Sequence, residues 1–297
     1  MTHPTTRTRQ WLHAVAVVIG ASRPISWINT AFPFAAAYLL TGGGIDWRWV
    51  CGTLFFLVPY NIAMYGINDV FDFESDIRNP RKGGVEGTVT DRVHHRLLLT
   101  ASAVTTVPFL VLLLVGGTWA SGVWLVVSSL MVLAYSVKGL RFKEKPFLDS
   151  VTSAAHFVTP ALVGATMTGN PVGSWFIWSM VAFFLWGMAS HALGAIQDVT
   201  ADRAGGLASI ATVTGAANTA RLATAWYVLA ALILLFLPSP SFIAALAVVP
   251  YAVNSGRFMG LADDNCTRAR SGWRVFLLYN YLAGAIITIT MLASTIG

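Results

Sequence analysis

The sequence predicts an all-α membrane protein, a bundle of nine transmembrane helices. Its 297 residues are 56% hydrophobic and 11% charged, with a mean hydropathy of +0.65. Soluble domains carry about 25% charged residues, so this composition favours a chain that crosses a membrane several times. Nine apolar stretches are long enough to span a bilayer, and the placement of the basic residues agrees with nine spans.

Residues 1–24 are predicted to form an interfacial segment ahead of a single membrane domain over residues 25–297. Arg7 and Arg9 precede an apolar run over residues 11–21. As a helix, this run would be about 16 Å long, whereas the hydrocarbon core is about 30 Å thick. Such a helix lies along the membrane surface. Arg23 and Pro24 follow it where a signal peptide would have its cleavage site.

The nine predicted spans set the topology. They cover residues 25–43, 48–70, 96–116, 119–138, 147–168, 174–196, 217–237, 240–257 and 274–295. With this count, all 19 Lys and Arg residues except Arg48 lie on the side of the N-terminus. The positive-inside rule therefore predicts a multi-pass protein of the cell membrane, with its N-terminus in the cytoplasm and its C-terminus outside.

Two features of the composition exclude other classes of protein. The net charge of +6 does not indicate a nucleic-acid partner, because the basic residues lie in short loops and form no patch. The two cysteines, Cys51 and Cys266, form neither a disulfide framework nor a metal-ligand spacing.

A cluster of polar residues lies at the end of the second predicted span. It consists of Asn68, Asp69, Asp72 and Asp76. The three aspartates are three and four residues apart, so on a helix they share one face, which the same spacing extends back to Tyr65 and Asn61. Glu74 lies off this face and is expected to be solvated. Carboxylates are costly near hydrocarbon, so this cluster predicts a functional site.

A second acidic cluster lies at the end of the sixth predicted span, on the same cytoplasmic side. Asp198 and Asp202 are one helical turn apart there. Two sets of oxygen ligands at a membrane surface predict Mg²⁺ as the cofactor and a diphosphate as the substrate.

Cationic residues suited to a diphosphate follow the second and fourth spans. They are Arg78, Arg81 and Lys82 after the second span, and Lys138, Arg141, Lys143 and Lys145 after the fourth. Arginine binds phosphate through two parallel hydrogen bonds, and lysine binds it as a point charge. Among these residues, Lys138 and Arg141 are the strongest candidates for binding the diphosphate, because they lie closest to a span end. For any single residue, an ordinary positive-inside role is the alternative.

The two acidic clusters, Asn68-Asp-x-x-Asp-x-x-x-Asp76 and Asp198-x-x-x-Asp202, resemble the paired signature of the UbiA superfamily of intramembrane prenyltransferases. Tyr135-Ser136, Arg141, the stretch 145–149 and Arg23-Pro24 resemble that family too, and the resemblance covers nearly the whole chain. It implies nine helices around a central cavity under a cytoplasmic cap. It also implies two Mg²⁺ ions that bridge the diphosphate, held by Asn68, Asp69, Asp72, Asp76, Asp198 and Asp202.

The same resemblance implies a mechanism. The allylic C–O bond breaks, and the prenyl carbocation forms in an aromatic, water-poor pocket before the acceptor attacks it. Asn68, Asp72, Tyr135, Lys138 and His191 are the residues expected to be catalytic. Arg78, Arg81, Lys82 and Arg141 are expected to bind the diphosphate.

The continuous string from Asn68 to Gly87 is similar to that of lycopene elongases. This likeness implies dimethylallyl diphosphate as donor, lycopene or another apolar acceptor within membrane lipid, and a carotenoid cyclase as a downstream partner. The spans are rich in Phe, Trp and Leu and offer no obvious arginine for an aromatic acid. An aromatic prenyltransferase of the quinone or haem pathway is the alternative enzyme. A cation transporter is disfavoured, because Asp46 and Arg48 are almost the only charges on the far side.

Two histidines are candidates for the last chemical step. His191 lies seven residues before Asp198, on the same helix face and roughly 10 Å deeper, and His156 lies within the fifth span. A neutral imidazole can take the proton that remains after an alkene attacks a carbocation. A hydrogen-bonded structural role is the alternative. Asp149 is expected to cap the fifth helix, and the alternative is that its side chain reaches the site.

Overall fold

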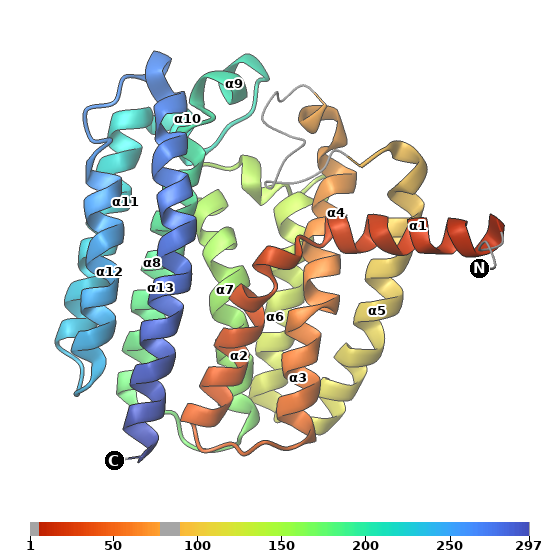
Figure 1. Cartoon of the computed structure of the whole chain (residues 1–297), viewed down its shortest axis with the longest axis vertical. Helices are drawn as coiled ribbons and strands as arrows, with labels where there is room; N and C mark the ends of the chain where they lie inside the picture. The colour runs from red at the N-terminus through yellow and green to blue at the C-terminus, as the bar shows by residue number, and fades with distance from the viewer. Residues whose placement is uncertain (1–5, 78–89, 297) are drawn as a thin grey trace, which may run out of the picture. The chain divides into compact units, whose positions relative to one another are not determined.

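The computed structural model describes residues 6–77 and 90–296, and every regular element within these ranges is a helix (Figure 1). The all-α prediction is therefore confirmed. The chain divides into two compact units, residues 1–141 with 159–170 and residues 142–158 with 171–297. Helix α7 (Leu148–Met167) contributes its first half to the second unit and its second half to the first. The single domain over residues 25–297 stays a prediction.

The first unit contains the first four predicted spans. Its elements are α1 (Thr6–Ala21), η1 (Pro24–Ser26), α2 (Ile28–Leu40), α3 (Trp47–Leu57), α4 (Pro59–Asp76), η2 (Arg92–His94), α5 (His95–Gly116) and α6 (Trp119–Ser136). Phe34, Phe55, Phe56 and Tyr60 form its aromatic core, where most ring pairs meet edge to face or tilted. Helix α2 packs closely on α7 at Gly164, where an added Cβ would lie 2.4 Å from the Phe34 carbonyl oxygen.

The second predicted span is two helices, because α3 ends at Leu57 and α4 begins at Pro59. Proline has no N–H for the helix ladder, so the chain breaks there. The buried Asn61 side chain donates through Nδ2 to the carbonyl oxygens of Phe56 (2.9 Å) and Leu57 (3.1 Å). The Thr30 hydroxyl donates to the Phe56 oxygen at 2.6 Å. These side chains replace backbone donors where water is absent.

The N-terminus of α3 is capped by Asp46, which lies just before the second predicted span. Asp46 Oδ1 accepts the Trp49 N–H at 3.0 Å, and Asp46 Oδ2 accepts the Tyr38 hydroxyl at 2.8 Å. The Trp49 N–H favours the charged carboxylate, which lowers the pKa of Asp46.

Replacing Asp46 with alanine is expected to lower the free energy of unfolding by about 1 kcal/mol, because the first turn of α3 loses its cap. Since the folded pKa lies below the unfolded value, the carboxylate contributes stability above about pH 4, and this contribution is lost as the pH falls through the lowered pKa. Thermal unfolding in detergent at pH 7 and pH 3 measures both effects. Asp46→Asn, which keeps a capping oxygen, is the control; a loss equal to that of alanine would contradict the cap.

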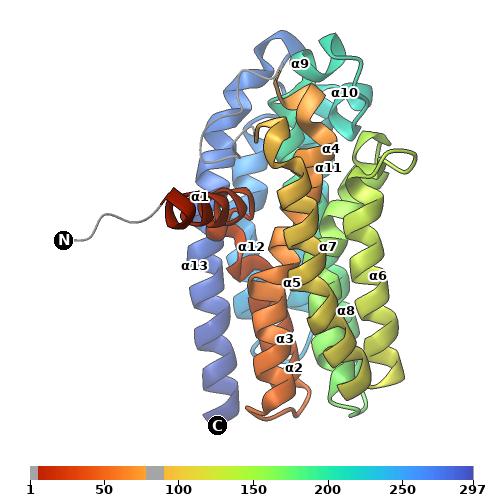
Figure 2. The same cartoon turned by 90° about the vertical axis from the view of Figure 1, so that its right-hand side faces the viewer.

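Helix α1 crosses α4 and α5 on the outside of the first unit (Figures 1 and 2). Trp11, Leu12 and Val15 are exposed on it. A short helix with exposed apolar side chains that crosses the spanning helices is typical of an interfacial segment. The interfacial role of residues 1–24 was inferred from the length of the apolar run and stays a prediction.

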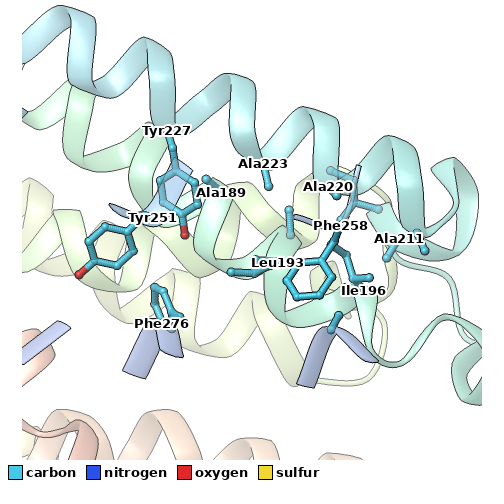
Figure 3. Packing of buried hydrophobic residues seen from close by; sticks show 14 of the residues in the cluster. Ala189, Leu193, Ile196, Ala211, Ala220, Ala223, Tyr227, Tyr251, Phe258 and Phe276 are labelled. Atoms are coloured by element: carbon cyan, nitrogen blue, oxygen red, sulfur yellow. The ribbon is translucent and has the colours of Figure 1, made fainter. Parts of the chain in front are cut away.

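The second unit contains the first part of the fifth predicted span, the last four predicted spans and several short helices. Its elements are η3 (Phe142–Glu144), the first half of α7, α8 (Ser174–Ile196), α9 (Val199–Ala204), α10 (Ile210–Thr214), α11 (Ala216–Leu235), α12 (Ser241–Gly256), η4 (Asp263–Arg268) and α13 (Ala269–Ile296). Helix α8 has the predicted bounds, whereas α9, α10 and η4 were not predicted. Alanines of α11 face α8, while Tyr227, Tyr251 and Phe276 gather at one end of the same core (Figure 3).

With α3 and α4 taken together as one helix, the described ranges contain six helices that are long and apolar enough to cross a membrane. The number is seven if the bent pair formed by α1 and by η1 with α2 counts as one span. Helix α12, with 16 residues, is apolar but shorter. The chain is therefore a multi-pass membrane protein, while the count of nine spans and the side on which each terminus lies stay predictions.

Candidate functional site

The acidic residues of the first cluster lie on the last turns of α4. Asp69 and Asp72 are both buried, with 3% and 5% of their surface exposed. Ser136 of α6 donates its hydroxyl to Asn68 Oδ1 at 2.9 Å. Asp76 is the last residue of α4, and its side chain lies outside the described part. Because α4 is one continuous helix over these positions, 69, 72 and 76 lie on one face as expected.

Arg23 is a site residue that the sequence did not single out. Its Nη2 lies 3.0 Å from Asp69 Oδ1, and its guanidinium carbon lies 4.4 Å from the centre of the Tyr65 ring. The backbone at Arg23 is left-handed (φ 52°), a conformation that costs energy and often occurs at functional sites. Arg23 therefore neutralises Asp69 at the end of α4. The only signal in the sequence was the Arg23-Pro24 pair before the first span.

The candidate site residues at and after the end of α6 lie in different surroundings. Arg141 donates from Nη1 to the Phe71 carbonyl oxygen at 3.2 Å, so it lies against the acidic end of α4, and it too has a left-handed backbone (φ 40°). Tyr135 is partly buried in the last turn of α6, and Lys138 is exposed just after it. The predicted diphosphate ligands Arg78, Arg81 and Lys82 lie outside the described residues.

The second acidic cluster lies where α8 passes into α9. Asp198 is the residue before α9, Asp202 lies one turn later, and both are partly buried. Gln197 donates from Nε2 to the Gly194 carbonyl oxygen at 3.0 Å. Its Oε1 is buried and accepts no hydrogen bond within the described part of the chain. Gln197 therefore has a buried amide oxygen next to Asp198 in the chain that could serve as a metal ligand.

A network around Arg203 holds the short helices that carry Asp202. Arg203 Nε and Nη2 donate to the Thr212 carbonyl oxygen at 2.9 and 2.7 Å, and its Nη1 lies 2.6 Å from Asp263 Oδ2. Asp263 Oδ1 accepts the Ala216 N–H at 2.6 Å and so caps α11. Helix α9 is therefore tied to α10, α11 and η4.

Asp149 connects three elements of the second unit. Its Oδ1 accepts the Ser150 N–H at 2.7 Å, and its Oδ2 accepts the Ile210 N–H of α10 at 2.7 Å. His191 Nε2 of α8 lies 3.6 Å from Asp149 Oδ2. Asp149 was expected to cap the fifth helix. It is the second residue of α7 and not the residue before it, but its carboxylate accepts the Ser150 N–H of the first turn, and it also holds the start of α10.

The donor chemistry of both clusters fits Mg²⁺. Every side chain there offers hard oxygen atoms, including the unused Gln197 Oε1. No three His, Cys, Asp or Glu side chains within residues 6–77 and 90–296 already surround one metal position. Such a preformed cage is not needed, because Mg²⁺ often takes only one or two carboxylates and completes its shell with water and substrate phosphate.

Comparisons with known proteins agree on the family. The profile of the UbiA prenyltransferase family matches residues 30–281. A protein of Corynebacterium glutamicum named lycopene elongase/hydratase is 54% identical over 282 residues, which make up 95% of this chain and 98% of that protein. A lycopene elongase/hydratase of Halobacterium salinarum is 31% identical over 213 residues, 71% of this chain and 70% of that protein.

Among solved structures, a UbiA homolog from Archaeoglobus fulgidus bound to DMAPP and Mg²⁺ has the same fold. The TM-score is 0.67, and the match covers 92% of this chain and 99% of that one. Because the sequence identity is 15%, this likeness concerns the fold alone.

Proposed function

Because the chain belongs to the UbiA prenyltransferase family and is a prenyltransferase, we propose that it transfers a dimethylallyl group from its diphosphate to lycopene in the biosynthesis of long-chain carotenoids. The observation that carries this proposal is the 54% identity to a lycopene elongase/hydratase over almost the full length of both chains. The apolar spans, which carry few groups for orienting an aromatic acid, support a hydrocarbon acceptor.

The acidic clusters are the proposed binding sites for Mg²⁺ and, through it, for the diphosphate. Its ligands would be Asn68, Asp69, Asp72, Asp76, Asp198 and Asp202, with Gln197 Oε1 as an additional oxygen. Bound Mg²⁺ would neutralise the charge that develops on the leaving diphosphate. Arg23 already neutralises Asp69, so the remaining carboxylates carry most of the negative charge available to the ion.

The proposed cationic contacts are Arg141, Lys138, Arg78, Arg81 and Lys82. Arg141 is supported by its contact with Phe71, which lies between the two buried aspartates of α4. A cationic side chain in this position stabilises the departing diphosphate more than the bound substrate, and so lowers the barrier to breaking the allylic C–O bond. Tyr135, in the last turn of α6, would position the substrate.

The proposed topology places the N-terminus and the acidic clusters in the cytoplasm and the C-terminus outside. It rests on the basic residues, all of which except Arg48 would then be cytoplasmic.

Membranes that contain the protein, incubated with labelled dimethylallyl diphosphate, lycopene and Mg²⁺, test the function. We expect label in carotenoids heavier than lycopene, loss of that label with EDTA, and its return with added Mg²⁺. Turnover of a long-chain prenyl diphosphate and an aromatic acid, without a lycopene product, would replace the carotenoid assignment with the aromatic one. Folded protein that is inactive with every donor would contradict both.

His191 is the proposed proton acceptor. When the terminal double bond of the acceptor attacks the allylic cation, a new C–C bond forms and a tertiary cation remains, which must lose a proton or gain water. His191 Nε2 lies on the side of Asp149 Oδ2, at 3.6 Å, so Nδ1 is the ring nitrogen that would take up the proton.

Replacing His191 with glutamine is expected to reduce formation of elongated carotenoid about a hundredfold, the usual contribution of a general base. Release of diphosphate should fall much less, because the C–O bond breaks before the proton leaves. Labelled pigment and released diphosphate are measured in the same reaction. His156→Gln is the matched control on α7, and a larger loss of pigment in that variant would move the role to His156.

A further inference from the structure

Four aromatic rings form a row between α8 and α13 in the second unit. Trp273 and Phe276 stack with ring centres 4.8 Å apart and planes at 19°. Phe276 is followed by Trp186 at 5.8 Å and 31°, and Trp186 by Phe183 at 5.7 Å and 29°. The contacts at Tyr251 are mostly edge-on, with planes at 69° to 82°. The planes within the row meet at only 19° to 31°, so its packing differs from these contacts.

The row begins next to the second acidic cluster. An added Cβ at Gly194 would lie 3.1 Å from the Trp273 ring, so the indole packs against the backbone of α8 at a position that has no side chain. Gly194 is one helical turn before Asp198. Trp186 and Phe183 lie about 12 and 16 Å further back along α8. The row therefore leads from the acidic end of α8 into its apolar part.

The rings of the row are supported by neighbouring side chains and yet remain partly uncovered. Phe183, Trp186 and Trp273 are all partly exposed, whereas Phe276 is buried. Tyr251 packs edge-on against the Trp186 ring at 82°. Its hydroxyl donates a hydrogen bond to Asn280 Oδ1 at 3.0 Å, which holds the Tyr251 ring in place against Trp186. Rings that are fixed but partly uncovered can bind a ligand without rearrangement.

We propose that the aromatic row of Phe183, Trp186, Trp273 and Phe276 binds the conjugated chain of the acceptor. The inference rests on the proposed function. The stacked rings cover one another's faces, so the row offers a chain that lies along it a strip of apolar ring edges. The edge of an aromatic ring carries partial positive charge and is attracted to a π-system, so this strip matches a flat polyene that has no hydrogen-bonding groups. Helix α8 carries no Asp, Glu, Lys or Arg from Ser174 to Ile196, so it offers no charged partner to a polar acceptor. The row thus extends from the reacting end of the acceptor along its hydrocarbon chain.

Substituting the two tryptophans tests the row. In Trp186→Leu and Trp273→Leu, the concentration of lycopene that gives half-maximal rate should rise at least tenfold, while that of dimethylallyl diphosphate changes less than twofold. Trp186→Phe keeps a ring and should recover most of the lycopene affinity. Trp226→Leu is the matched control, because Trp226 on α11 packs against the same core outside the row. It should match the wild type for both substrates.

The absorption spectrum of bound lycopene gives a readout that does not depend on turnover. In purified protein in lipid nanodiscs, lycopene should absorb at longer wavelength than in empty nanodiscs, and Trp186→Leu should remove most of this shift. An unchanged lycopene affinity and spectrum in both leucine variants, or equal effects in Trp226→Leu, would overturn the inference. Wild-type protein that elongates no lycopene would instead refute the proposed function, so the two failures are distinguishable. If a leucine variant does not fold, Trp186→Phe and Phe183→Leu are measured in the same way.

Discussion

Replacement of Asp72 with asparagine is expected to reduce prenyl transfer about a thousandfold. Asp72 is 5% exposed and lies one turn after Asp69, whose charge Arg23 neutralises. Asparagine keeps the shape of the side chain and removes its negative charge, so it weakens Mg²⁺ binding and the stabilisation of the leaving group together. Loss of one preorganised electrostatic contact typically costs a hundredfold to a thousandfold in rate.

The measurement is the initial rate of label transfer at equal amounts of folded protein. Glu74→Gln is the matched control, because it removes the same charge from the same helix. Glu74 is exposed, lies off the acidic face and pairs with Arg92. That variant should stay within twofold of the wild type. Asp72→Asn activity within tenfold of the wild type would contradict the assigned role of Asp72.

Replacement of Asp149 with alanine is expected to lower the free energy of unfolding by about 3 kcal/mol. Asp149 is completely buried, and alanine would leave the N–H groups of Ser150 and Ile210 without their acceptor. A buried donor left without a partner costs about 1–3 kcal/mol, and two are affected here. The carboxylate also lies in the first turn of α7, where the helix dipole favours a negative charge.

Thermal unfolding in one detergent compares Asp149→Ala with Asp264→Ala, which removes an exposed carboxylate from η4. The second variant should unfold within a degree or two of the wild type. Asp149→Asn should fall between the two, since its single oxygen accepts one of the two N–H groups. Equal melting temperatures for the wild type and Asp149→Ala would show that α10 is held by other contacts.

Helix positions could be predicted from hydrophobicity alone, since each predicted span lies on a helix whose bounds differ by a few residues. The largest differences are in the second span. Pro59 breaks it, as the loss of one backbone N–H requires, and α4 continues to Asp76 because a helix does not end where its residues become polar. Short helices such as α9 and α10 have too few residues for a periodic pattern.

The candidate site could be predicted where spacing along one helix determines it. Asp69 and Asp72 share a face of α4 for that reason. Asn61 was expected to extend this polar face. Its side chain instead donates a hydrogen bond to the Phe56 carbonyl oxygen at the break between α3 and α4. The roles of Arg23 and Asp149 depend on contacts 46 and 61 residues away in the chain, and neither contact has a local signal. Helical periodicity also contains no information on the division into two compact units.

The break between α3 and α4 has an evolutionary consequence. Pro59 removes a backbone donor, and Thr30 and Asn61 supply side-chain donors to the carbonyl groups next to the break. Loss of Asn61 would remove the side-chain donor of the Leu57 carbonyl oxygen, and loss of either residue would leave the Phe56 oxygen with one side-chain donor in place of two. Positions 30, 59 and 61 should therefore covary among related proteins. Relatives that have no proline at position 59, and so an unbroken helix there, should more often have apolar residues at positions 30 and 61.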